Sequence, residues 1–377
     1  MLEKRLLKNL DFVTIGTVLA IMFFGLVVIR SATLAFTANS PDPYLFVRKQ
    51  IASIALGWVV AFLILTSDYS GWARYAKFFY WLNLALLAAV KVLGYSALGA
   101  TRWIKLGPFQ FQPSELAKIL VIVTLATHLA KQEKVKEWRD FIPPLLHVAL
   151  PLVLVLIQPD LGTSLVFIAI LVGMLFMAGA PVPKLFALIG GGIAAAVGVV
   201  LAELKFGLNF PLKEFQLKRL IIFLNPESDR LGDGYHIIQS KIAVGSGGLL
   251  GKGLFFGTQN QLNFLPEQHT DFIFSVIGEE LGFIGGITLI LLFFFLLYRG
   301  IRAASQAREQ YGTLLATGVV SMLAFHVLTN IGMTIGMMPV TGIPLPFVSY
   351  GGSSMLTNSV AIGILLNVYM RRRKILF

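Results

Sequence analysis

Long apolar runs limit the folds open to this chain more than any other feature of its sequence. Hydrophobic residues make up 56% of the 377 residues and charged residues only 13%, far more apolar material than the core of a water-soluble protein of this length needs. A helix crosses the roughly 30 Å hydrocarbon core of a bilayer with about 20 residues, because each residue adds about 1.5 Å. The sequence therefore predicts an all-α polytopic membrane protein.

Ten of these runs are long enough to cross a bilayer, and one long loop interrupts them. We predict a single membrane domain over residues 1–377, with an extracellular loop of residues 205–270 between the seventh and eighth spans. A loop of this length among otherwise short connections is usually functional. The ten predicted spans cover residues 11–33, 47–66, 74–95, 113–131, 141–158, 160–178, 183–204, 271–298, 311–333 and 347–370.

The distribution of lysine and arginine indicates the orientation of these spans. With the amino terminus inside, every predicted inner segment carries at least one Lys or Arg, and the chain ends on the basic cluster 371–374. The positive-inside rule then places both termini in the cytoplasm and the 205–270 loop outside the cytoplasmic membrane. The formal net charge of +12 does not indicate nucleic-acid binding, because no basic stripe alternates with aromatic residues.

The residue types leave little support for a dedicated metal or thiol centre. The chain has no cysteine, which excludes thiolate chemistry, outward disulfides and cysteine-type zinc sites. Its five histidines are scattered and lack HExxH spacing. No cofactor is required by the sequence.

Two stretches of the long loop have patterns with more than one interpretation. Residues 213–225 mix Lys213, Lys218 and Arg219 with apolar residues, as in an amphipathic helix on the bilayer surface or in a solvated helix. Residues 245–257 contain six glycines, which permit either close approach of the backbone to a ligand or a flexible hinge. The glycine-rich stretch lacks GxxxxGK[ST] and is not a P-loop.

Ionisable residues gather where the long loop meets the eighth predicted span. Such side chains cost several kcal/mol at a membrane boundary, so they usually mark a site. From the residues alone, a helix N-cap and a catalytic carboxylate are equal alternatives for Asp271. Glu279 and Glu280 lie too far along the helix to share its proton, and we expect them at a helix interface. The group comprises Glu267, His269, Asp271, Glu279 and Glu280.

Other polar residues interrupt apolar surroundings elsewhere. Glu115 and Lys118 lie three residues apart on one helix face, either as a structural ion pair or lining a polar cavity. Asp160 follows a tight turn, and its favoured interpretation is the N-cap of the next helix. Prolines and glycines across residues 336–346 forbid a continuous helix, so this backbone must line a cavity or pack against protein.

Several motifs together resemble the SEDS family, the shape, elongation, division and sporulation membrane proteins of bacterial wall synthesis. The carboxyl-terminal signature is met by Asn330, Gly336, Pro339, Gly342 and the SYGGSS run of residues 349–354. FQPSELAK, QPDLGTS and LPEQHTDFIFSVIGEELG also match, so the resemblance covers nearly the whole chain. NPESDRLGDGYHIIQSKIAVGSGGLLGKG and GTQNQLNFLPE look like the rod-elongation branch rather than the division branch.

The resemblance implies a fold, an activity and partners. The family fold has ten helices and a large fourth extracellular loop, and its members polymerise lipid II into peptidoglycan strands on the outer face of the cytoplasmic membrane. The implied partner is the class B penicillin-binding protein PBP2, a transpeptidase, within the elongation complex and among membrane lipids. The acid of the HTDF motif, essential in the family, is Asp271 here, whereas Gln268 stands where a basic residue is common.

The chemistry of lipid II polymerisation assigns roles to these residues. An α-linked diphosphate donor that gives a β-1,4 polymer requires inversion, one base on the acceptor hydroxyl, and charge stabilisation of the leaving diphosphate. A second acid is dispensable because the leaving group already carries its charge. Asp271 is the predicted base. Lys118, Arg219 and Lys241 are the predicted diphosphate cations, with a bridging Mg or Mn ion as an alternative. The other predicted substrate-binding residues are Gln112, Glu115, Asp160, Glu267, His269 and Ser353.

Two rival functions fit a polytopic chain of this kind. A lipid II flippase or other transporter also combines many helices, broken backbone and charges within the membrane. Its site, however, should lie near the midplane between repeats, whereas this sequence has no internal repeat and its polar motifs gather at the outer ends of helices. A non-catalytic scaffold for wall assembly is the second rival.

Overall fold

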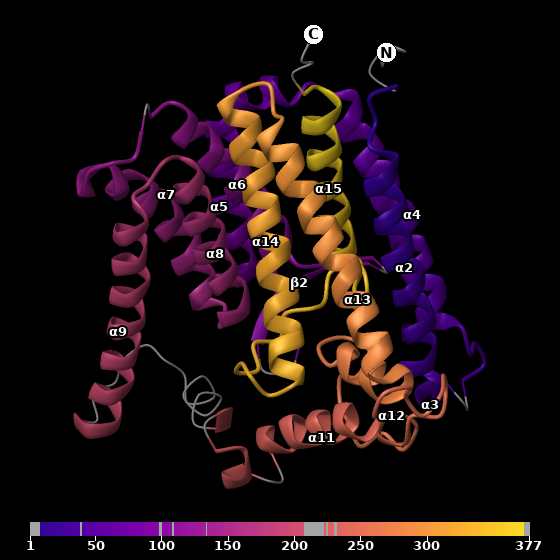
Figure 1. Ribbon diagram of the computed structural model, residues 1–377. Coiled ribbons are helices and arrows are strands. Elements are labelled where there is room, and N and C mark those ends of the chain that lie inside the picture. Colours follow the sequence, from indigo (N-terminus) through magenta and orange to yellow (C-terminus); the bar gives the residue numbers. More distant parts are fainter. Residues whose placement is uncertain are drawn as a thin grey trace.

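The computed structural model describes residues 8–37, 40–97, 100–107, 109–132, 134–206, 222–223, 225–229 and 232–372, which form a bundle of long helices (Figure 1). The helices are α2 (Phe12–Ala32), α3 (Leu34–Thr37), α4 (Leu45–Thr66), the 3₁₀ helix η1 (Tyr69–Tyr75), α5 (Ala76–Leu93), α6 (Pro113–Ala130), α7 (Trp138–Ile157), α8 (Leu161–Met177), α9 (Val182–Phe206), the 3₁₀ helix η2 (Pro226–Asp229), α11 (Asp233–Ser246), α12 (Thr258–Gln261), α13 (Ile273–Ser305), α14 (Gln310–Thr334) and α15 (Gly352–Met370).

Each predicted apolar run corresponds to a helix in the described part of the chain. Nine of the helices there are long and apolar enough to cross a membrane, and the apolar helix α8 is shorter, at 17 residues. The protein is therefore a multi-pass membrane protein. The last helix begins at Gly352 rather than at 347, and the backbone of residues 347–351 is not helical.

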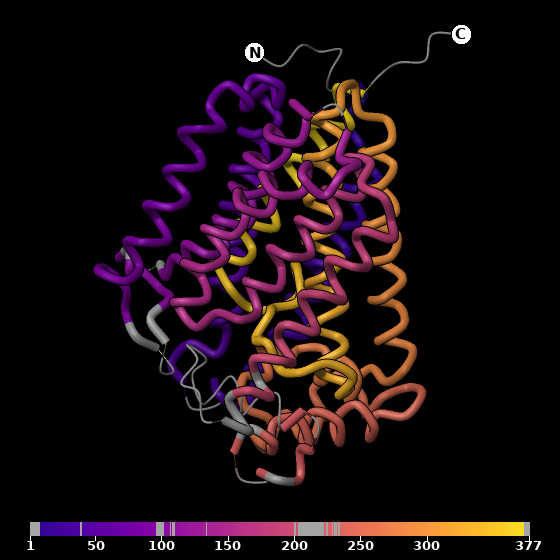
Figure 2. Tube along the Cα trace, turned by 90° about the vertical axis from the view of Figure 1, so that its left-hand side faces the viewer, coloured from indigo at the N-terminus to yellow at the C-terminus, as the bar shows by residue number. Residues whose placement is uncertain are grey.

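The bundle has two distinct ends. At the terminal end, where α2 begins and α15 ends, an Arg372 guanidinium nitrogen donates to the carbonyl oxygen of Asn9 over 3.1 Å. At the loop end, opposite to it, α11 and α12 lie across the bundle (Figures 1 and 2). The broken backbone before α15 and the start of α13 also lie toward the loop end (Figure 1).

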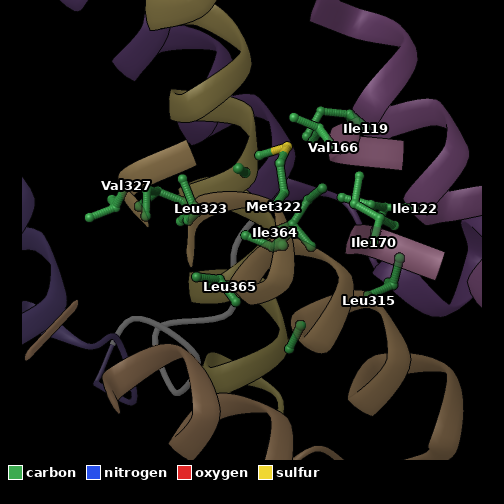
Figure 3. Packing of buried hydrophobic residues seen from close by; sticks show 14 of the residues in the cluster. Ile119, Ile122, Val166, Ile170, Leu315, Met322, Leu323, Val327, Ile364 and Leu365 are labelled. Atoms are coloured by element: carbon green, nitrogen blue, oxygen red, sulfur yellow. The ribbon is translucent and has the colours of Figure 1, made fainter. Parts of the chain in front are cut away.

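The interior of the bundle is built around α14. Its side chains pack against α6, α8 and α15, with Ile122, Ile170, Met322 and Ile364 meeting in one cluster (Figure 3). Helices α6, α14 and α15 are mostly buried, whereas α9 is mostly exposed along its length and stands at one edge (Figure 1). Exposed apolar side chains on the peripheral helices suit contact with lipid.

A buried ion pair fastens α2 to α13 near the terminal end. Asp11 caps α2 through the Thr14 backbone N–H, and both of its carboxylate oxygens contact Arg299, at 2.6 and 3.1 Å. Burial raises the pKa of Asp11, but hydrogen bonds from Arg299 and Thr14 outweigh burial and hold that pKa below its ordinary value. The stabilisation is therefore present near neutral pH and is lost as pH falls through the lowered pKa.

Asp11→Ala is expected to lower the free energy of unfolding by about 3–5 kcal/mol, because it leaves the Arg299 charge buried without its partner. Asp42→Ala is the control, since Asp42 pairs with Arg48 at 3.0 Å on the surface, where a pair contributes less than about 1 kcal/mol. Denaturant unfolding of both variants in detergent measures the difference. Equal losses would mean that the Asp11 pair does not stabilise the bundle.

A small antiparallel sheet between α5 and α6 was not predicted. Strands β1 (Tyr95–Ala97), β2 (Ala100–Leu106) and β3 (Phe109–Phe111) pair in that order. From β2, Arg102 donates to the Gln158 and Pro159 carbonyl oxygens just after α7, where a helix carries partial negative charge. Hydropathy treats this stretch only as a polar loop, because its strands are too short to give a periodic signal.

Helix α13 is sharply bent at Gly282, whose φ of 63° and ψ of −160° are not helical. The Phe274 ring lies 3.4 Å from where a Cβ of Gly286 would be. Twelve residues would separate the two by about 18 Å along a straight helix. The first section, residues 273–281, therefore folds back on the second. The predicted unbroken span over 271–298 is wrong in this respect.

The glycine-rich stretch packs against this bend. Added Cβ atoms at Gly247 and Gly251 would lie 1.9 and 2.1 Å from the carbonyl oxygens of Gly278 and Glu280. The Phe283 and Ile284 N–H groups bond to the Gly248 and Leu249 carbonyl oxygens. Of the two interpretations of these glycines, the structure shows close approach of the backbone. The element that this backbone approaches is α13.

Glu279 and Glu280 fix the loop between α11 and α13, at the helix interface expected for them. Glu279 accepts from Lys252 at 2.7 Å and from the Gln259 N–H at 2.9 Å. Glu280 accepts from the Ser31 hydroxyl at 2.7 Å, which ties α13 to the end of α2. Both side chains are fully buried with all four carboxylate oxygens bonded.

Candidate active site

The broken segment, residues 335–351, is the non-helical backbone between α14 and α15, and hydrogen bonds join it to residues 269–271. The Asn330 amide donates to the carbonyl oxygens of Asp271 and Ile343, at 2.9 and 2.8 Å. The Ser349 hydroxyl donates to the Thr270 carbonyl oxygen at 2.6 Å, and the Tyr350 N–H to that of His269 at 2.9 Å. The backbone around the HTDF motif is therefore fixed from two sides.

Two helices approach the broken segment through glycine. A Cβ at Gly25 of α2 would lie 2.8 Å from the Phe347 carbonyl oxygen. A Cβ at Gly162 of α8 would lie 2.7 Å from that of Thr341. Of the two alternatives for this proline-rich backbone, packing against protein accounts for most of it, since Ile343 and Leu345 to Val348 are buried.

Gly25→Ala is expected to destabilise the protein by about 1–3 kcal/mol and to lower its activity, because the new methyl group forces the broken segment to shift. Gly16→Ala is the matched control on the same helix, where a Cβ would meet nothing within 4 Å. Thermal unfolding and turnover of the two variants are compared. A Gly25→Ala protein as stable as the Gly16→Ala protein would contradict this packing.

Asp271 lies two residues before the first helical residue of α13. The N-cap position of α13 belongs to the next residue, Phe272. Its Oδ2 is 3.3 Å from where a Cβ of Gly342 would stand, so the carboxylate lies over the broken segment at a glycine with φ of 70°. The Asp271 residue is half-buried.

His269 and Glu267 flank the acid on its loop side. The His269 ring lies among Phe36, Phe46 and Tyr350, at centroid distances of 5.3–5.9 Å. Burial lowers the pKa of His269, against the opposing effect of Glu267, so the ring is neutral near pH 7. Glu267 is exposed and accepts from the Thr270 hydroxyl at 3.0 Å.

Glu115 and Lys118, both on α6, form a buried ion pair on the side of the helix that faces α14. The Lys118 ammonium is 2.7 Å from Glu115 Oε1 and 3.2 Å from His326 Nε2. The Lys118 side chain is only 1% exposed. We did not single out His326 from the sequence. The only signal was its position four residues before Asn330, on the same face of α14, and that spacing cannot identify a partner on another helix.

Gln112, Asp160 and Ser353 meet where α6, α8 and α15 begin. Asp160 is the N-cap of α8, as predicted, and accepts from the Thr163 N–H at 3.1 Å. The Gln112 amide donates to Asp160 Oδ2 at 3.3 Å, and its backbone N–H donates to the Ser353 hydroxyl at 3.1 Å. This cluster is joined to the broken segment through Gly162, two residues after Asp160.

Lys241 is exposed on α11 and lies beside the broken segment. Its Cδ is 2.8 Å from where a Cβ of Gly336 would be. The neighbouring Ser240 hydroxyl bonds to the Ser275 hydroxyl at 2.6 Å and to the Thr334 carbonyl oxygen at 2.7 Å, which fixes α11 to α13 and α14. The predicted cation Arg219 lies outside the described residues.

Comparison with known proteins identifies the family of the chain. The model of the cell cycle protein family FtsW/RodA/SpoVE matches residues 11–374. The chain belongs to this family. Two curated relatives are 40% identical to it: the peptidoglycan glycosyltransferase MrdB of Escherichia coli K12, with 92% of this chain and 91% of the relative covered, and the probable peptidoglycan glycosyltransferase FtsW of Trichlorobacter lovleyi, with 96% and 93% covered.

The family fold is also present in solved structures. A chain from a peptidoglycan synthase complex, described as coordinating polymerization and crosslinking, aligns with a TM-score of 0.79 at 34% identity, covering 96% of this chain and 97% of that one. As a member of this family, the protein is a glycosyltransferase. The Gln268 amide is buried and donates to the Ala32 and Asn260 carbonyl oxygens at 3.0 and 3.2 Å.

Proposed function

We propose that the protein polymerises lipid II into β-1,4 glycan strands, with Asp271 as general base. The observation that carries the proposal is the placement of this acid. Its backbone is fixed by Asn330, its carboxylate lies over Gly342, and the N-cap position of α13 belongs to the next residue, Phe272. A carboxylate within hydrogen-bond reach of a sugar hydroxyl can take its proton as the hydroxyl attacks.

The proposed step is a single displacement. Asp271 takes the proton of the acceptor 4-hydroxyl as its oxygen attacks the anomeric carbon of the donor. The bond from that carbon to the diphosphate breaks, its electron pair leaves with undecaprenyl diphosphate, and the configuration inverts. Because the departing diphosphate is already anionic, cations near it stabilise the transition state and no second acid is needed.

Cations from two sides serve the diphosphate in this proposal. Lys241 is exposed beside the broken segment and contacts an arriving phosphate first. Lys118 lies deeper, and exchanges its Glu115 contact for a phosphate oxygen when the diphosphate enters between α6 and α14. Arg219 stays a predicted third cation. Gln112, Asp160, Glu267, His269 and Ser353 stay predicted substrate contacts at the loop end.

The described residues do not fit a resident divalent cation. No group of three or more His, Asp or Glu side chains within the described ranges could hold a metal ion. A Mg or Mn ion that bridges the diphosphate and one carboxylate needs no such group and stays a prediction.

The rest of the proposal concerns placement in the cell. With α8 as the tenth span, both termini lie in the cytoplasm, the loop end faces outward, and residues 205–270 form the large loop of a single domain. The GTQNQLNFLPE and NPESDRLGDG stretches support the elongation branch, RodA, acting in rod shape. The proposed partner is a class B penicillin-binding protein such as PBP2, with other elongation-complex proteins and membrane lipids around it.

Incubation of the purified protein with lipid II in detergent tests this function. A polymerase makes glycan strands without any membrane, whereas a flippase makes none. The assay is run with and without the transpeptidase partner, so that a requirement for the partner is seen as a difference between the two. Absence of strands in both conditions would contradict the proposed function.

A further inference from the structure

His326 is a buried histidine that no step above uses. It lies on α14 with no exposed surface, and its Nε2 is 3.2 Å from the Lys118 ammonium of α6. The same ammonium contacts Glu115, three residues earlier on its own helix, at 2.7 Å. Lys118 is therefore held from two helices at once.

The contact with Lys118 fixes the chemical state of the His326 ring. An ammonium group has three donors and no acceptor, so the ring nitrogen that faces it must accept. The ring proton then lies on Nδ1 and the imidazole is neutral. A protonated ring would place two positive charges about 3 Å apart in a buried site that has a single carboxylate, Glu115, which is strongly unfavourable.

The same contact sets the direction of the lysine. A Lys side chain has four flexible methylenes, and Glu115 alone would hold it along the surface of α6. His326 draws the ammonium toward α14 instead. Four residues further along α14, Asn330 holds the backbone of Asp271, about 6 Å away along the helix axis. Residues one helical turn apart on α14 thus contact the Lys118 ammonium and the Asp271 backbone.

We infer that His326 is a positioning residue for glycosyl transfer, which accepts a hydrogen bond at Nε2 and fixes the Lys118 ammonium on the side of α6 that faces α14. The inference rests on the proposed function, in which Lys118 stabilises the leaving diphosphate. Two atoms of this group, Glu115 Oε2 and His326 Nδ1, are buried without a hydrogen-bond partner among the described residues. The Nδ1–H group can donate to a phosphate oxygen when the diphosphate enters, whereas Glu115 Oε2 can only accept, as from a hydroxyl group of the substrate.

Three substitutions of His326 distinguish the need for a hydrogen-bond acceptor at the place of Nε2 from the need for an imidazole ring. The amide of glutamine reaches the place of Nε2, whereas the amide of asparagine reaches only the place of Nδ1. His326→Gln is expected to keep kcat for lipid II polymerisation within about threefold of wild type. His326→Asn and His326→Leu are expected to lower kcat by roughly 10²-fold with little change in KM, the effect of misplacing a catalytic charge by about 1 Å. Equal activity of the Gln and Asn variants would overturn the inference.

His147 supplies the matched control pair. It is also a histidine that contacts α6, through Nε2 and the Thr124 hydroxyl at 2.9 Å, but its ring stacks with Tyr80 and His128. His147→Gln and His147→Asn are expected to have kcat values within about threefold of each other. A tenfold or larger difference between them would show that the Gln and Asn comparison reports a general packing effect, and would overturn the inference.

Histidine ¹⁵N NMR gives a readout that does not depend on activity. The His326 signals, assigned by their loss in His326→Gln, are expected to show a proton on Nδ1 and a bare Nε2, and the Nε2 shift should change in Lys118→Met. A proton on Nε2 would overturn the inference whatever the kinetics. A wild-type protein that makes no strands would contradict the proposed function and this role with it, whereas an active wild type with equal Gln and Asn variants would contradict this role alone.

Discussion

Asp271→Asn is expected to lower the rate of lipid II polymerisation by 10²–10⁴-fold, the contribution of a general base. The amide has the size and shape of the carboxylate but cannot accept the hydroxyl proton. Because Asp271 contributes its carbonyl oxygen, not its carboxylate, to the bond from Asn330, the backbone of the site should stay in place. Initial rates with saturating lipid II measure the loss.

The controls for this variant separate chemistry from folding. The melting temperature of Asp271→Asn is expected to match wild type, since the amide keeps the size of the carboxylate and the bond from Asn330 uses the backbone carbonyl oxygen. Asp271→Glu keeps a base on a longer side chain and is expected to retain more activity than Asp271→Asn. A Glu variant as inactive as the Asn variant, with both folded, would argue that the position is needed for binding rather than for proton transfer.

Lys118→Met is expected to lower turnover by about 10²–10³-fold, as loss of a charge that stabilises a developing anion does. Methionine fills a similar volume without the ammonium. The change also leaves Glu115 buried without its ion-pair partner, and such a loss costs about 3–5 kcal/mol of stability. Protein level and melting temperature must therefore be measured beside turnover.

A double variant resolves the two effects. In Glu115→Gln/Lys118→Met no charge is left buried, so stability is expected to recover while turnover stays low. Lys252→Met is the matched control, because Lys252 also pairs with a glutamate, Glu279, at 2.7 Å, but away from the proposed chemistry. It is expected to keep turnover near the wild-type rate. Recovery of turnover in the double variant would show that Lys118 has only a structural role.

The positions of the helices were predictable because an apolar run is a local property of the sequence. α2, α4 and α6 begin within two residues of their predicted starts. The bend at Gly282 was not, because one glycine inside an apolar run leaves hydropathy unchanged. Packing of the 247–251 backbone against the bend explains both the glycine at the bend, Gly282, and the glycines of the 247–251 stretch.

The candidate site was predictable where a motif marks it and not where contacts cross between helices. The proline-rich pattern predicted the broken segment, and three-residue spacing offered the Glu115 and Lys118 ion pair as one of two alternatives. The sequence left the N-cap and catalytic interpretations of Asp271 equal, and the structure places Phe272, not Asp271, at the N-cap position of α13. His326 contacts Lys118 from 208 residues away, a separation over which spacing gives no signal.

The rate of glycan-strand formation from lipid II in detergent, compared between wild type and Asp271→Asn at equal concentrations of folded protein, tests the central claim most directly. We expect strands from the wild type and, over the same time, none from the variant. Strands formed at equal rates by both proteins would contradict the assignment of Asp271 as the base.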